Sequence, residues 1–284
     1  MRELIQYCFP DNNLSCTKSI RPGAEYIIVY VFISVTSVFT VFLNLLVIVS
    51  ISHFKQLHTP TNVLILSLAV ADLIAGLILM PVQGMKLIEP CWYFGEIFCS
   101  IFPLILYVVV TASLGNLVII SVDRYIFLIN PERNHSCIGE CVLYVKMEYL
   151  ILDSFVCLVA PCCVIFSLYV KICFVANYQA KQLNSATDKK ARSEKKAART
   201  LGIVVLVYLL CWMPYYLVTL SLGHDENDSL IINIMYWILC LNSCMNPLIY
   251  AMFYRWFRLS AKYILTLKIF EPSSEYFNLF PEEK

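Results

Sequence analysis

An uninterrupted apolar run, Leu201–Leu222, limits what this chain can fold into more than any other stretch. Its 22 residues carry no charge. As a helix rising about 1.5 Å per residue they span about 30 Å, the thickness of the hydrocarbon core of a bilayer. Pro214 lies near the middle of the run, where a proline removes a backbone hydrogen bond and kinks a helix. A kink of this kind is tolerated in lipid where neighbouring helices or buried water satisfy the freed carbonyl. The run therefore predicts one kinked helix of a membrane bundle.

The composition favours the same class for the whole chain. Of the 284 residues, 60% are hydrophobic and 14% are charged, whereas soluble domains carry about 25% charged residues. The net charge of +1 gives no support to a nucleic-acid partner. The sequence has no metal-ligand spacing, no paired nucleophile and base, and no phosphate-binding loop. We therefore expect a membrane protein that is not an enzyme and needs no cofactor.

Five further stretches are apolar enough to cross a membrane. They are Tyr26–Ser52, Thr61–Gln83, Cys99–Ile129, Tyr149–Tyr178 and Leu230–Tyr254. We expect an all-α transmembrane fold with an extracellular tail at 1–25, a membrane domain at 26–254 and a cytoplasmic segment at 255–284. In the last segment, Arg255–Phe270 alternates basic and apolar residues at helical spacing, which predicts an amphipathic helix on the inner membrane surface.

The charges of the loops predict the orientation. Asn177–Thr200 is basic, and short basic loops remain in the cytoplasm, whereas Gly223–Ser229 is acidic and is expected outside. The amino terminus is then outside, and Asn13 in Asn13-Leu14-Ser15 is expected to be glycosylated. An oxidising outer face makes the cysteines of polar segments candidates for disulfides. These are Cys8, Cys16, Cys91, Cys99, Cys137 and Cys141.

Asp72 is a carboxylate at mid-depth of the predicted span Thr61–Gln83. A charged side chain costs on the order of 3 kcal/mol to insert at this depth, even on the mildest scale. We therefore expect Asp72 to face the interior of the bundle and to have a function. The alternative is a polar residue that is merely paired with a neighbouring helix.

Five features stand in one order, each in its own span. They are Asn44, Asp72, Asp123-Arg124-Tyr125, Cys211-Trp212-Met213-Pro214 and Asn246-Pro247-Leu248-Ile249-Tyr250. Followed by a basic surface helix, this order resembles the rhodopsin-like G-protein-coupled receptors. Four segments look more specifically like the trace amine-associated receptors: SISHFKQLHTPTN at 50–62, CWYFG at 91–95, KKAARTLG at 195–202 and YRWFR at 254–258.

The resemblance implies a chemosensory receptor of the plasma membrane that binds a small protonated amine. Its cytoplasmic face would then open to a heterotrimeric G protein. Two alternatives stay open. One is a non-signalling or incomplete receptor form, and the other is a transporter or channel. Against the transporter or channel, the sequence shows neither the internal repeat nor the paired broken helices of many transporters.

The resemblance also implies roles for single residues. A polar cluster accessible to sodium is implied for Asp72, Ser113, Asn242, Ser243 and Asn246. Coupling to the G protein and switching between states are implied for Asp123, Arg124, Tyr125, Tyr169, Trp212, Asn246, Pro247 and Tyr250. Disulfides are implied between Cys99 and Cys141 and between Cys8 and Cys137, with Cys16 as the competitor for Cys137.

The ligand site departs from the pattern of aminergic receptors. Leu106 stands where those receptors carry an aspartate on the third span, and leucine cannot bind an ammonium. Asp153, eight residues before Pro161 on the outer part of its span, is the candidate replacement, as in some fish receptors of this family. A desolvated carboxylate binds an ammonium through a short charge-assisted hydrogen bond. The alternative is a side chain that reaches interfacial water. Aromatic walls are expected from Tyr107, Trp212, Tyr215, Tyr216 and Trp237.

One of the seven crossings of such a receptor is missing from the sequence. Arg124 belongs inside and Cys141 outside, yet they are only 17 residues apart, about 26 Å of helix. Residues 130–136 between them are also too polar to insert. We therefore expect a seven-helix receptor bundle with six recognisable spans and no fourth helix. Either the product is misassembled, or the sequence is a splice form or gene model that lacks about one helix, and we favour the latter.

Overall fold

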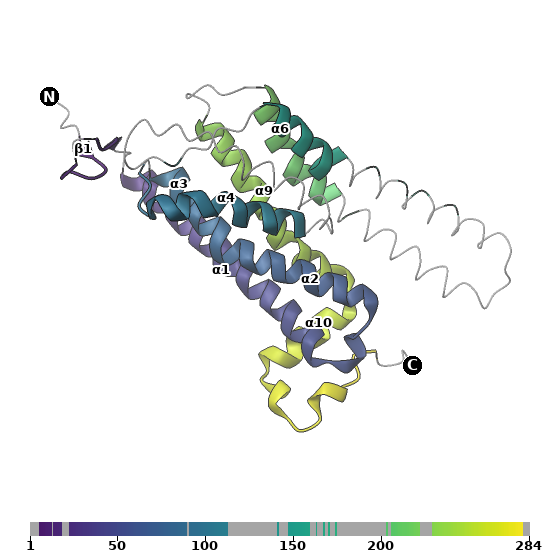
Figure 1. The fold of residues 1–284 in the computed structure, drawn as a ribbon. Coiled ribbons are helices and arrows are strands. Elements are labelled where there is room, and N and C mark those ends of the chain that lie inside the picture. Colours follow the sequence, from purple (N-terminus) through teal and green to yellow (C-terminus); the bar gives the residue numbers. More distant parts are fainter. Residues whose placement is uncertain are drawn as a thin grey trace.

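The computed structural model describes most of the chain at both of its ends and parts of its middle. The described residues are 6–12, 14–18, 23–89, 91–112, 141, 147–159, 206–221 and 229–280, together with the single positions 163, 167, 170, 174 and 203. Within these parts the fold is helical apart from one two-stranded sheet (Figure 1).

Three long helical units pack against one another, and one of them consists of several labelled elements that follow without a break. Helix α1 (Gly23–His53) packs against α2 (Pro60–Ile74), α3 (Met80–Ile88) and α9 (Ser229–Phe253). A π-helical turn, η2 (Ala75–Leu79), joins α2 to α3 without a break in the helix. Three described segments are long and apolar enough to cross a membrane, in agreement with three predicted spans. They are Tyr26–His53, Asn62–Ile88 and Ile231–Phe253.

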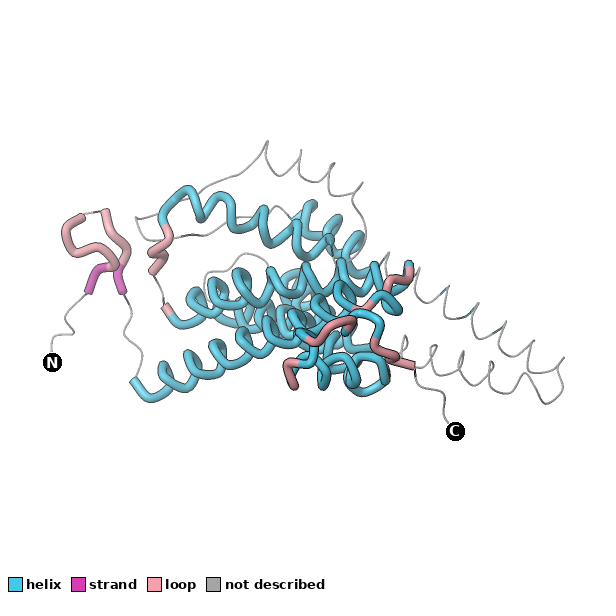
Figure 2. Tube along the Cα trace, turned by 90° about the horizontal axis from the view of Figure 1, so that it is seen from below, coloured by secondary structure: helices cyan, strands magenta, loops and turns pink. Residues whose placement is uncertain are grey.

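Three further helical segments complete the described bundle. Helix α4 (Gly95–Ala112) packs against α2 and η2, and it contains Pro103. Helix α6 (Met147–Ser154) continues into a π-helical turn, η3 (Phe155–Val159). The segment Leu206–Ser221 is an apolar helix and contains Pro214 of the predicted kinked span. The two views show the long helices lying alongside one another (Figures 1 and 2).

The side chains of α1 show why this helix is stable in the bundle. One face carries exposed Ile28, Val31, Val35 and Val38, at spacings of three to four residues, which suits contact with lipid. The opposite face is buried and includes small and polar groups that allow close approach of neighbouring helices. The buried residues are Ile33, Ser37, Thr40, Asn44, Val47 and Ile51.

At one end of the bundle, the connection between α1 and α2 packs against the carboxyl-terminal residues. The short turn η1 (Lys55–Leu57) follows α1, and Thr59 caps the start of α2 through the backbone N–H of Asn62. Helix α10 (Arg255–Leu265) packs against α1 and α9. Two 3-10 turns, η6 (Lys268–Phe270) and η7 (Ser274–Tyr276), then lead the chain back towards η1.

The surface helix is shorter than predicted. We expected it to run over Arg255–Phe270, but α10 ends at Leu265. Leu267 has a φ of 59°, in the left-handed region that an α-helix of L-residues cannot continue through. The chain therefore turns at this point, and residues beyond it pack against the bundle instead of extending the helix.

At the opposite end, a hairpin of β1 (Gln6–Tyr7) and β2 (Thr17–Lys18) lies over the connection between α3 and α4 (Figures 1 and 2). The strands pair antiparallel, with Tyr7 opposite Thr17. The ring of Phe9 meets the ring of Tyr93 edge-on, 6.0 Å between centroids. The hairpin is therefore held against the end of the bundle by side-chain contacts as well as by the Cys8–Cys91 disulfide.

The disulfides correct one prediction. Cys99 is bonded to Cys141, the pair that the resemblance implies. The implied Cys8–Cys137 pair is wrong, because Cys8 is bonded to Cys91, with their Cα atoms 5.6 Å apart. The contact of Phe9 with Tyr93 places Cys8 beside Cys91, a proximity that no sequence spacing reveals. Cys16 is also disulfide-bonded, and Cys137 lies outside the described residues.

Candidate functional site

Asp153 is the half-buried carboxylate of α6. The hydroxyl of Tyr216 donates a hydrogen bond to its Oδ2 at 2.9 Å. Tyr216 itself is buried, on the helix Leu206–Ser221. A carboxylate offers acceptor sites for about four hydrogen bonds, so Asp153 is a group to which an ammonium can donate. The pair thus joins α6 to the helix Leu206–Ser221 through a group that can also receive a cation.

The aromatic residues of the helix Leu206–Ser221 form a continuous stack that includes Tyr216. The Trp212 ring lies 5.0 Å from that of Tyr208 and 6.1 Å from that of Tyr216, in nearly parallel planes. Tyr215 meets Tyr216 edge-on at 5.3 Å. Trp212 stands two residues before Pro214, and its indole N–H has no hydrogen-bond partner within the described part of the chain. The stack therefore connects Asp153 to the residues around the proline.

The other predicted aromatic residue, Trp237, lies in a separate apolar cluster. It is buried on α9 with Tyr236 and Cys240, and Leu106 of α4 packs against the same cluster. The ring of Tyr215 meets that of Tyr236 edge-on at 5.7 Å, so the two aromatic groups are in contact. Leu106 thus contributes apolar surface and no charge at the position where aminergic receptors carry an aspartate. Tyr107 belongs to α4, but its side chain lies outside the described part of the structure.

A second group of polar residues lies deep between α1, α2 and α9. The amide of Asn246 donates to Oδ2 of Asp72 at 2.8 Å, and Ser243 also makes a side-chain hydrogen bond to this carboxylate. Asn44 donates to the backbone carbonyls of Thr40 and Ser243, each at 3.0 Å. Asp72 is 2% exposed, so a carboxylate is buried here among neutral donors. Such a group favours a bound cation or a proton.

Several predicted residues take part in this polar group and others do not. Asn242 is half-buried on α9, and the described hydrogen bonds of Asp72 come from Asn246 and Ser243. Pro247 lies within α9, and Tyr250 is buried with its ring 5.9 Å from that of Tyr254. The predictions for seven residues lie outside the described parts. These are Asn13, Ser113, Asp123, Arg124, Tyr125, Cys137 and Tyr169.

Lys86, a cation at the outer end of the bundle, makes contacts that the sequence patterns do not predict. Lys86 of α3 donates to the backbone carbonyl of Cys141 at 3.4 Å. Its Nζ lies 5.1 Å from the ring centroid of Trp92 and 5.4 Å from that of Phe102, within the range of a cation–π interaction. The lysine thus helps to hold the Cys99–Cys141 link against α3. The only signal in the sequence was a charge three residues beyond the predicted end of the span at Gln83.

Lys18, Tyr26 and Glu89 form a second outer group. Glu89 accepts a hydrogen bond from Tyr26 and forms an ion pair with Lys18 at 3.5 Å. Burial by itself lowers the pKa of Lys18, but its contacts with Tyr93 and Glu89 outweigh this effect and raise the pKa above the ordinary value. The lysine therefore stays charged and links the hairpin to the start of the bundle.

Comparison with known proteins identifies the class to which this arrangement belongs. The chain matches the family described as 7 transmembrane receptor (rhodopsin family) in two stretches, residues 43–140 and 132–250. It is 33% identical to trace amine-associated receptor 13c of Danio rerio over 328 aligned positions, which cover 97% of this chain and 96% of that receptor.

Mammalian relatives match over a similar length. The identity is 33% to trace amine-associated receptor 6 of Pan troglodytes, covering 98% of this chain and 96% of the relative. It is also 33% to trace amine-associated receptor 5 of Mus musculus, covering 96% and 95%. The chain therefore belongs to the rhodopsin family of seven-transmembrane receptors and, within it, to the trace amine-associated receptors. It is a multi-pass membrane protein and a receptor, not an enzyme.

Proposed function

We propose that this protein is a receptor for small protonated amines that transmits binding to a heterotrimeric G protein. The names of its relatives support the amine as ligand class. The single observation that carries the proposal is the contact of Tyr216 with the Asp153 carboxylate at 2.9 Å. It places a negative group at the head of an aromatic stack that reaches the proline of the kinked helix.

Asp153 supplies the negative charge that an ammonium needs. The ammonium donates to the carboxylate, and the neighbouring aromatic faces stabilise its positive charge. Leu106 leaves the usual third-helix position apolar, so the ammonium end of the ligand turns towards α6. This position of the acid is the one found in the fish-type subgroup that the sequence resembles. Tyr107, Tyr215 and Trp237 would enclose the remainder of the ligand.

The transmission step uses residues in both parts of the bundle. A ligand on Asp153 bears on Tyr216 and through it on Trp212, which turns over the Pro214 kink. At the inner end, Arg124, Tyr169 and Tyr250 would then receive the G protein as the cytoplasmic face opens. The Asp72 cluster would hold a sodium ion in the resting state, because its described donors are neutral and leave a buried negative charge.

We also propose that the amino terminus is extracellular in the plasma membrane and that the chain lacks the fourth helix of its family. Two observations support the gap. The family match is divided into two stretches that overlap at 132–140. The alignment to receptor 13c of Danio rerio has 328 positions against 284 residues, so at least 44 positions have no residue of this chain. Sequencing the transcript between Ile129 and Cys137 decides whether these residues exist in the expressed protein.

The amine site is tested by replacing Asp153 with Asn both in this chain and in a version restored with a fourth helix. G-protein activation by 2-phenylethylamine and by 1,5-diaminopentane is measured. We expect the potency to fall by tens- to a hundredfold, the effect of losing about 2–3 kcal/mol from a charge-assisted bond. Glu148→Gln is the matched control for 2-phenylethylamine, because this monoamine has no second ammonium for Glu148, an exposed acid on the same helix. An unchanged potency in Asp153→Asn refutes the site. Amine-driven current or uptake without a G protein would instead indicate a transporter or channel.

A further inference from the structure

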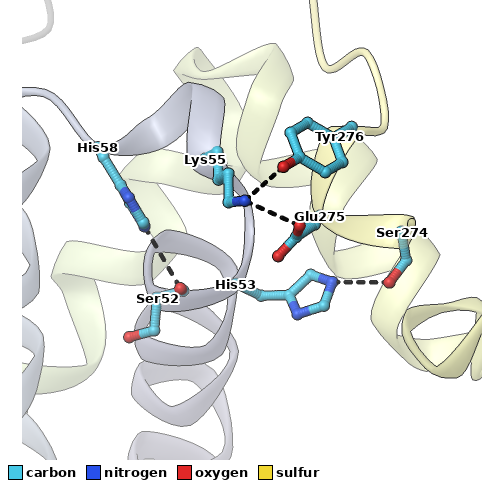
Figure 3. A network of polar contacts seen from close by, with 7 residues as sticks. All are labelled: Ser52, His53, Lys55, His58, Ser274, Glu275 and Tyr276. Carbon is cyan, nitrogen blue, oxygen red and sulfur yellow. Dashed lines mark hydrogen bonds and ion pairs between the residues drawn. The ribbon is translucent and has the colours of Figure 1, made fainter. Parts of the chain in front are cut away.

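The last described residues of the chain fold back against the connection between α1 and α2. We call residues 271–280 the tail segment. Lys55 donates to Oε1 of Glu275 at 2.8 Å and to the hydroxyl oxygen of Tyr276 at 2.6 Å (Figure 3). His53 Nε2 lies 3.0 Å from Ser274 Oγ. Because the Ser274 hydroxyl donates to the carbonyl of Ile269, it accepts from His53. Three consecutive tail residues are thus held by side chains of one short connection.

Apolar contacts hold the tail segment more firmly than these polar ones. Leu279 is 0% exposed and belongs to a core cluster with Phe54, Leu57 and Trp256. Its backbone N–H donates to Oε1 of Gln56 at 3.1 Å. The ion pair of Lys55 is exposed and is therefore weak and screened by salt. The burial of Leu279 is the main anchor of the tail segment.

The tail segment contains a tyrosine followed three residues later by a bulky aliphatic residue, Tyr276-Phe277-Asn278-Leu279. Proteins that bind short peptides commonly hold the backbone in an extended form and read side chains in separate pockets. A tyrosine and an aliphatic side chain at this spacing suit a peptide-binding protein with two such pockets. In this structure the two side chains differ in access: Tyr276 is 61% exposed, whereas Leu279 is fully buried.

Three features of the docked tail segment prevent a peptide-binding protein of this kind from binding it. Residues Ser274–Tyr276 form a 3-10 turn instead of an extended strand. The Nζ of Lys55 covers the Tyr276 ring at 4.3 Å from its centroid and also bonds the hydroxyl. Leu279 is enclosed by the cluster described above. Docking on the receptor and binding to such a protein therefore exclude each other.

We propose that residues 276–279 are a binding site for a cytoplasmic protein that reads a tyrosine and an aliphatic side chain in an extended peptide, and that docking of the tail segment on residues 53–57 withholds this site. The inference rests on the proposed function and on all seven crossings being present in the expressed receptor, because seven crossings from an outside amino terminus place this end in the cytoplasm. Adaptors that gather membrane proteins into coated vesicles have this recognition chemistry. Release of the tail segment would thereby control how long the receptor stays at the cell surface.

The test measures binding of the purified full chain, in detergent, to the isolated cargo-binding domain of a clathrin adaptor. In detergent both faces are accessible, so the result is independent of the membrane orientation, which antibody access to tagged termini tests separately. The double variant Lys55→Ala/Gln56→Ala loosens docking and leaves residues 276–279 intact. If the wild-type tail is docked in about nine molecules of ten and the variant weakens docking about tenfold, about half of the variant molecules are undocked and binding is about fivefold tighter.

Two further variants complete the design. Tyr276→Ala in the loosened background should abolish binding to the adaptor domain. Lys262→Ala removes an exposed charge from α10 and should bind like the wild type. Lys55 and Gln56 are exposed, so their replacement leaves the core of the bundle unchanged. The proposal is overturned if the loosened chain binds no better than the wild type, or if Tyr276→Ala leaves binding intact.

Discussion

Tyr216 and Asp153 are joined by a hydrogen bond although they are 63 residues apart in the chain. The bond couples the position of an acid on α6 to a buried tyrosine of the helix Leu206–Ser221. A change in the charge state or partners of Asp153 must therefore act on Tyr216. On the proposed function, this is the first step by which a bound amine reaches the interior of the bundle.

Replacing Tyr216 with Phe keeps the ring in the aromatic stack and removes only the hydroxyl. We expect an amine agonist to lose about tenfold in potency, because a hydrogen bond to a charged group contributes about 1.5 kcal/mol. The measurement is the concentration dependence of G-protein activation. Tyr30→Phe is the control, since this tyrosine lies on α1 beside Tyr26, whereas Tyr216 makes the bond to Asp153. Equal losses in both variants would show that the bond has no special role.

Replacing Asp72 with Asn removes the buried charge and nearly preserves the shape of the side chain. A ligand that binds only the folded state raises stability, and sodium at about 100 times its Kd adds about 2.7 kcal/mol. We expect the wild-type Tm in detergent to be higher in sodium chloride than in N-methylglucamine chloride. In Asp72→Asn this difference should vanish, whereas Asp153→Asn should retain it. A sodium effect that persists without the Asp72 charge would place the ion elsewhere.

The Cys8–Cys91 disulfide predicts equal effects of removing either cysteine. Loss of a disulfide lowers the free energy of unfolding by about 2–4 kcal/mol. Cys8→Ser, Cys91→Ser and the double variant should therefore lower Tm by the same amount. Cys163→Ser is the control, because this cysteine is free and exposed. Peptide mapping of the unreduced protein identifies the pair directly. A Cys91→Ser variant of wild-type stability would favour the pairing of Cys8 with Cys137.

Docking of the tail segment should depend on pH in two opposite ways. The hydrogen bond from Lys55 lowers the pKa of Glu275 below its ordinary 4.5, and the same contact raises the pKa of Lys55 above its ordinary 10.5. The contribution of Glu275 is complete above its ordinary pKa and disappears as the pH falls through the lowered value. The contribution of Lys55 is complete below its ordinary pKa and disappears as the pH rises through the raised one. Docking is therefore constant between these limits.

An environment-sensitive label on Phe280→Cys reports the docking as the pH is changed. The comparison needs a variant that removes only the acid and leaves the contact of His53 with Ser274 in place. In Glu275→Gln the loss of docking below the ordinary pKa of Glu275 should disappear. An identical acid limb in wild type and variant would assign the pH dependence to another group.

Parts of the fold could be predicted because they depend on local properties of the chain. Three predicted spans are apolar helices long enough for a membrane, and the length and hydropathy of a segment suffice to recognise such a helix. The shorter extent of α10 could not be predicted in the same way. Basic and apolar residues keep their helical spacing to Phe270, and the left-handed turn at Leu267 follows from packing of the tail segment.

The sequence by itself determined the membrane class, the order of the polar residues along the spans and the family. It also pointed to Asp72 and Asp153, since an acid in an apolar segment is costly wherever the segment packs. Only the tertiary structure decided that Asp153 meets Tyr216, that Cys8 meets Cys91 and that Lys55 meets Glu275. These partners are 63, 83 and 220 residues apart. Their contacts depend on how each helix is rotated and on where the chain turns at both ends of the bundle. The residue pattern of a single helix is compatible with several such arrangements.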